Sequence, residues 1–137
     1  MAFDITKTAV SETGTCELNG PDDEPLYDGK TRLAIEVFGP GSKQFAKAQT
    51  RRSNKAMERI RKKGKPDISA DDSAEESAIY LATITKSINF DYPPAAGRDD
   101  FQKFKALYKD ETLGFIRDQV AEFVGEWGNF TGKSSGN

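Results

Sequence analysis

The spacing of apolar residues changes once along this chain, at the Gly-Pro-Gly run of residues 39–41. Before that run, apolar and polar residues alternate, so that Leu33, Ile35 and Val37 share one face. A period of two is typical of a half-buried strand. After the run, apolar residues recur at spacings of three and four, which is typical of amphipathic helices. This order of patterns predicts an α+β fold, mostly helical, with an N-terminal β-hairpin followed by about four α-helices.

Capping and turn residues set the boundaries of these expected elements. Ser42 stands where a helix N-cap belongs, and Ser73 with Glu76 matches a capping box. We predict a single domain over residues 1–130 and a disordered polar tail at 131–137. The expected elements are a hairpin at 14–38 and helices at about 42–63, 73–88, 99–109 and 112–127.

Size and cysteine content fit an intracellular domain with a small core. A chain of 137 residues can fold without a metal or a disulfide, although 36% apolar content against 31% charge leaves a wide polar surface. Cys16 is the only cysteine, and no cation lies near it in the sequence to lower the pKa of its thiol. We therefore expect Cys16 to be a buried small apolar residue. No apolar run approaches the length that a membrane span needs, and residues 1–10 do not resemble a secretion signal.

The residue types needed for common catalytic and metal sites are missing or wrongly spaced. The chain has no histidine, which excludes histidine-based triads and histidine-ligated metals. The acidic run 67–76 lacks the glycine of a calcium loop, and Ala78 stands where the closing glutamate belongs. Gly132-Lys133-Ser134 lacks the rest of a phosphate-binding loop. We expect no enzyme, no catalytic residue, and no cofactor or metal site.

Positive charge is concentrated in the first predicted helix and just beyond it. Residues 43–65 hold ten of the chain's 20 basic residues and one acidic residue, Glu58. A surface that follows a nucleic-acid backbone is one interpretation. A solvated face or an acidic protein partner is favoured, because no aromatic residues are interleaved to stack on bases. The candidate polyanion contacts are Arg51, Arg52, Lys55 and Arg59.

The last predicted helix has the most regular apolar spacing. Leu113, Ile116, Val120, Phe123 and Trp127 recur at steps of three and four, and such a stripe is more often core than binding face. Aromatic residues beside a core stripe can also form a contact surface for an apolar partner. The candidate partner-binding residues on and beside the stripe are Phe115, Phe123, Trp127 and Phe130.

Several short runs occur along the chain in a characteristic order. They are residues 1–5, the loop 24–27, the turn 37–42, the basic run 51–56, and the closing runs 113–116, 119–120 and 126–130. This order of parts resembles the tail assembly chaperones of long-tailed bacteriophages and prophages. The resemblance covers most of the chain and includes no catalytic signature.

The resemblance implies a non-enzymatic role in virion assembly. Such chaperones bind the long, helical, hydrophobic tape-measure protein and keep it soluble until tail-tube subunits polymerise around it. It implies self-association, tape-measure protein as the main partner and a tail-tube subunit as a further candidate partner. It also implies a location in the bacterial host cytoplasm rather than in the mature virion. Two alternatives remain: a structural tail or head–tail connector protein that stays in the virion, and a nucleic-acid-binding protein that uses the basic helix 43–65.

Overall fold

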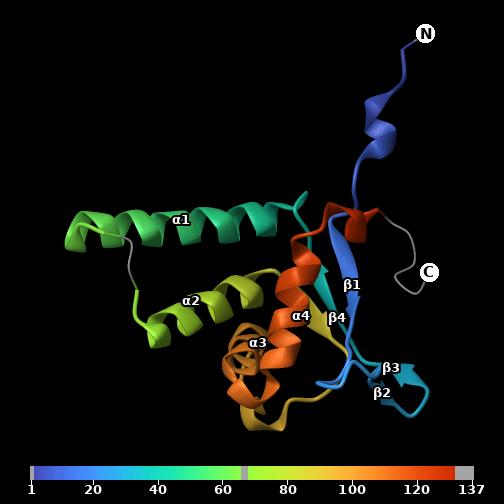
Figure 1. Ribbon diagram of the computed structural model, residues 1–137. Coiled ribbons are helices and arrows are strands. Elements are labelled where there is room, and N and C mark those ends of the chain that lie inside the picture. Colours follow the sequence, from blue (N-terminus) through green and yellow to red (C-terminus); the bar gives the residue numbers. More distant parts are fainter. Residues whose placement is uncertain (1, 66–67, 132–137) are drawn as a thin grey trace.

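The computed structural model describes residues 2–65 and 68–131. These residues form a mixed α+β fold in which helix exceeds strand, as predicted (Figure 1). The predicted tail at 131–137 lies outside the described residues except for Thr131. The elements are η1 (Ile5–Thr8), β1 (Thr13–Glu17), β2 (Tyr27–Asp28), β3 (Thr31–Arg32), β4 (Ala34–Phe38), α1 (Lys43–Lys63), α2 (Ala70–Thr83), β5 (Thr85–Ile88), η2 (Pro93–Ala95), α3 (Asp100–Lys109), η3 (Glu111–Leu113), α4 (Gly114–Val124) and η4 (Trp127–Phe130).

Three strands form an antiparallel sheet in the order β1-β4-β5, so β4 is the central strand. Cys16 of β1 pairs with Ile35 of β4, which pairs in turn with Ile88 of β5. Ile35 and Val37 are fully buried, whereas Glu36 between them is only half-buried. This alternation confirms the period of two that the sequence showed around these residues.

The predicted hairpin at 14–38 is present, but its connection has structure of its own. β1 and β4 are the two hairpin strands, and β2 and β3 pair as a short ribbon inside the connection. The Leu18 carbonyl accepts a hydrogen bond from the Leu26 N–H, and the Leu18 N–H donates to Leu33. An isolated bridge between Asn19 and Pro25 closes the loop. A hairpin needs support to be stable, and α4 lies against both β1 and β4.

The first and third predicted helices are confirmed, and so is the predicted N-cap of the first, Ser42. Ser42 accepts a hydrogen bond from the Phe45 N–H at 3.1 Å, and α1 ends at Gly64, whose φ of 76° is left-handed. Asp99 caps α3 by accepting from the Gln102 N–H at 2.9 Å.

The second predicted helix, at 73–88, is wrong at both ends. α2 begins at Ala70, because Ser69 rather than Ser73 is its cap and accepts from the Asp72 N–H at 3.2 Å. Its last residue is Thr83, and the chain then continues as strand β5.

The second helix ends earlier than predicted, and the side chains at 83–88 give the physical reason. Ile84 and Ile88 stand four residues apart, which suits a helical stripe equally well. However, Thr83, Ile84 and Thr85 are β-branched, and such residues favour strands. Pairing with β4 on its open edge then satisfies backbone groups that a helix would have satisfied internally. The sheet therefore gains a third strand that the apolar spacing alone did not reveal.

The fourth predicted helix, at 112–127, is shorter than expected. η3 precedes it, and α4 ends at Val124, so the buried stripe is Ile116, Val120 and Val124. After Gly125 the chain turns into η4, which changes the direction in which the last aromatic side chains point. The helical spacing that placed Trp127 in the core does not extend that far.

Phe130 closes the core from the end of η4. A Cβ atom placed on Gly14 would come within 2.9 Å of the Phe130 ring, and one placed on Gly39 would clash with the same ring. These two glycines lie together at the open end of the hairpin, where β1 begins and β4 ends, and leave room for the aromatic side chain. Phe123 packs edge-on against Phe130 with ring centroids 5.4 Å apart. The core thus joins the sheet, α2, α3, α4 and η4 in one cluster.

Candidate partner-binding site

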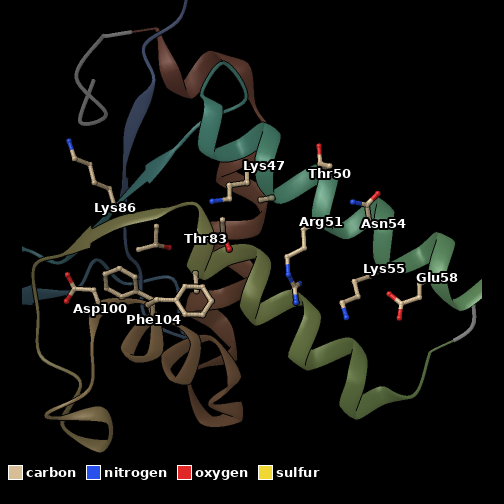
Figure 2. Close-up of a pocket in the computed structure, with 14 residues that line it drawn as sticks. Lys47, Thr50, Arg51, Asn54, Lys55, Glu58, Thr83, Lys86, Asp100 and Phe104 are labelled. Atoms are coloured by element: carbon tan, nitrogen blue, oxygen red, sulfur yellow. The ribbon is translucent and has the colours of Figure 1, made fainter.

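A groove runs between α1 on one side and the end of α2, β5 and the start of α3 on the other (Figure 2). Its volume is about 860 Å³. Apolar residues form its floor and charged side chains line its walls. The lining residues are Lys47, Ala48, Thr50, Arg51, Asn54, Lys55, Glu58, Ala82, Thr83, Thr85, Lys86, Asp100, Phe101 and Phe104.

The α1 wall of the groove is a helix with little contribution to the core. With 21 residues, α1 is about 31 Å long, yet Ala48 is its only buried residue. Figure 1 shows its C-terminal half extending well away from the sheet. Among the apolar residues of α1, Phe45 and Ala56 are half-buried, whereas Ile60 is exposed. Most of the α1 surface is therefore available to solvent or to a partner.

Polar and aromatic contacts fasten α1 to α2. Phe45 packs edge-on against Tyr80, and the guanidinium of Arg52 lies over the same ring, 4.5 Å from its centroid. One guanidinium nitrogen of Arg59, Nη1, donates to both carboxylate oxygens of Glu76, at 2.8 and 2.9 Å. Glu76, which the sequence placed in a capping box, instead holds the two helices together.

The four predicted polyanion contacts divide into two pairs. The guanidinium of Arg52 lies over the Tyr80 ring, and Arg59 forms an ion pair with Glu76. Arg51 and Lys55 are exposed and line the groove. Lys47, one turn earlier, joins them there. Of the ten basic residues at 43–65, Arg59 alone is half-buried and the others are exposed, so the basic surface continues beyond the groove.

The predicted aromatic contact surface on the last helix is largely internal. Phe130 is 0% exposed and Phe115 and Phe123 are half-buried, so Phe130 is a core residue and not a contact residue. Trp127, expected mainly in the core, is 58% exposed. The roles of Trp127 and Phe130 are reversed because α4 stops at Val124 and η4 reorients both side chains.

Phe101 is the exposed aromatic residue of the groove, although its spacing from Phe104, Leu107 and Tyr108 is that of a core residue. It stands one residue into α3 and is 39% exposed, whereas Phe104 beneath it is buried. Both residues fit the helical spacing of Leu107 and Tyr108. The position of Phe101 at the end of the helix, where the neighbouring elements diverge, was not visible from that spacing.

The buried polar groups of the molecule have structural partners. Burial raises the pKa of the Cys16 thiol to about 12, with a smaller contribution from Glu17, as expected for an apolar role. The Tyr108 hydroxyl and the Thr85 hydroxyl lie 2.6 Å apart, and Thr85 also donates to the Leu81 carbonyl. Over residues 2–65 and 68–131, no three side chains of the metal-binding types lie together as a metal-ion site would require. None of the helices in that same part is long and apolar enough to cross a membrane.

In the comparisons with known proteins, no protein-family model, no curated protein and no solved structure matches this chain.

Proposed function

We propose that this chain is a non-enzymatic tail assembly chaperone that binds the helical tape-measure protein and keeps it soluble during tail assembly. Two independent arguments support the proposal. The first is the sequence resemblance over most of the chain. The second is the groove beside α1, since a long helix with one buried residue has a surface that a helical client can cover.

The groove is the observation on which this proposal depends most. Helix-binding proteins take up an amphipathic helix by placing its apolar face in an apolar groove with polar edges. Here Phe101 and Phe104 form an apolar floor, and α1 contributes a charged edge. The same groove is also open to a nucleic acid. However, two of the four predicted polyanion contacts, Arg52 and Arg59, lie outside the groove lining and contact Tyr80 and Glu76.

Further parts of the proposal follow from a chaperone role. The protein would act in the bacterial host cytoplasm, would bind tape-measure protein, with tail-tube subunits as further candidate partners, and would be absent from the mature virion. Many copies would coat one long client, so self-association is part of the proposal. The exposed segment 2–9, with Phe3 and Ile5, offers an apolar surface for it.

Co-expression with the tape-measure protein tests the proposed function. We expect this chain to raise the soluble yield of the client severalfold and to co-purify with it. Phe101→Ser, on the groove floor, should reduce that yield, whereas Tyr27→Ser, an exposed aromatic residue on β2, should not. Circular dichroism verifies that both variants fold. A client whose soluble yield is the same with and without the chain would contradict the proposal.

A further inference from the structure

We propose that the groove recognises an acidic amphipathic helix. Its carboxylates would pair with Lys47, Arg51 and Lys55, while its apolar side chains would contact Phe101. This inference rests on the proposed function, because it specifies the chemistry of the client segment that the chaperone binds. It depends on the row of cations along α1 and on the apolar floor of the groove.

The basic wall of the groove is a regular row of cations. Lys47, Arg51 and Lys55 follow at steps of four, so they lie on one side of α1 and span about 12 Å of its axis. Figure 2 shows their side chains extending from α1 toward the space between α1 and α2. None of the three forms an ion pair with another described residue. Carboxylates at the same helical spacing on a helix beside α1 would complement this row.

The floor of the groove is apolar and built partly from small residues. Ala48 of α1 and Ala82 of α2 are buried, and their short side chains let another helix approach closely. Phe101 and Phe104 extend the floor at the start of α3, and only Phe101 is substantially exposed. An exposed aromatic ring next to a packed one is a typical anchor point for an apolar side chain of a partner.

The floor distinguishes a protein helix from a nucleic acid as the partner. Phosphate contacts need cations but gain nothing from the burial of Phe101. Single strands use several aromatic side chains on which successive bases stack, and the described lining has one exposed ring. A helix with one acidic and one apolar side satisfies both the wall and the floor.

Peptide binding to the full chain tests the inference. Two helix-stapled peptides of about 18 residues share one apolar face, and differ in having Glu or Lys at three flanking positions spaced by four. We expect the acidic peptide to bind at least about tenfold more tightly than the basic one in fluorescence anisotropy at near-physiological salt. Equal affinity for the two peptides would overturn the inference. Tighter binding of a single-stranded oligonucleotide than of the acidic peptide would also overturn it.

Charge reversal in the row tests whether the groove is the site. The variant Lys47→Glu, Arg51→Glu, Lys55→Glu should lose about tenfold in affinity for the acidic peptide and gain affinity for the basic one. The matched control reverses Lys30, Lys43 and Arg61, three exposed cations outside the groove lining, so the net charge is the same. Equal loss in the two variants would show that binding follows net charge alone and would contradict the inference.

Client solubility separates this inference from the proposed function. If the wild-type chain solubilises the tape-measure protein and the groove variant does so equally well, the inference is wrong and the proposed function stands. If the wild-type chain does not solubilise the client, the proposed function is wrong whatever the peptides do. Loss of client solubility in the groove variant, together with normal behaviour of the control variant, would support both.

Discussion

At the scale of single residues, the tightest requirement in this molecule is the space that Gly14 and Gly39 leave for the Phe130 ring. The glycines belong to the hairpin and the phenylalanine to η4, more than 90 residues later in the sequence. No local pattern connects them. Sequence analysis recognised Gly39 as part of a turn, but a close approach of this kind depends on the tertiary fold.

Replacing Phe130 should therefore destabilise the domain far more than replacing Trp127. Phe130→Ala removes a fully buried ring and should lower the free energy of unfolding by about 3–5 kcal/mol, whereas Trp127→Ala should change it by about 0.5 kcal/mol or less. Urea denaturation followed by circular dichroism measures both. Equal effects of the two substitutions would contradict the arrangement of η4.

Two buried acidic groups predict how stability responds to alkaline pH. Burial raises the pKa of Cys16 to about 12 and raises that of Tyr108 above its usual value, although the Thr85 hydrogen bond opposes the second shift. The thiol of the unfolded chain titrates near 9. Above that pH the folded state retains a proton that the unfolded state has released. The free energy of unfolding should therefore fall as the pH rises beyond about 9.

Urea denaturation at pH 7.5, 9 and 10 measures this dependence. Below about pH 9 both states hold the thiol proton, so the contribution of Cys16 is fully present there and is lost as the pH rises. Cys16→Ala should show a weaker decline between pH 9 and 10, because one of the two groups is gone. A wild-type stability that does not change over this range would contradict the burial of both groups.

At the scale of elements, polar and aromatic contacts join α1 to α2, and one of them is the ion pair between Arg59 and Glu76. Arg59 and Glu76 form a partly exposed pair, so we expect a coupling free energy of about 0.5–1 kcal/mol. A double-mutant cycle with Arg59→Met and Glu76→Gln measures it. The coupling should decrease in high salt. A coupling of zero at low salt would indicate that the pair does not hold α1 to α2.

Element boundaries show what the sequence could and could not predict. α1 and α3 were located correctly, because Ser42, Gly64 and Asp99 are strong local signals for helix ends. β5 was missed because its pairing with β4 is a contact between distant segments, and Ile84 and Ile88 fit a helix equally well. The groove depends on where α2 ends and α3 begins, so its floor could not be predicted either.

At the scale of the whole molecule, the N-terminal segment stands apart from the body. Residues 2–9 are exposed throughout, and Figure 1 shows them projecting beyond η4. Phe3 and Ile5 are apolar side chains in this segment, which makes it a candidate contact between copies.

Deletion of residues 2–9 should reduce self-association without unfolding the domain. None of these residues is part of the core cluster, so the melting temperature should stay within a few degrees of the wild-type value. Sedimentation velocity compares the size of the wild-type and shortened chains over a range of concentrations. Phe3→Ser with Ile5→Ser should reproduce the effect of the deletion. If both the deletion and the double substitution leave self-association unchanged, the copies contact each other through another surface.

The central claim is that a helical client binds in the groove, and site-specific photocrosslinking in the co-expressed complex tests it most directly. A photoreactive phenylalanine analogue at Phe101 lies on the groove floor, and the same analogue at Met57 of α1 lies outside the groove lining, where the side chain is 67% exposed. We predict crosslinking to the tape-measure protein from position 101 and little from position 57. Crosslinking from Met57 at an equal or higher yield than from Phe101 would contradict the account.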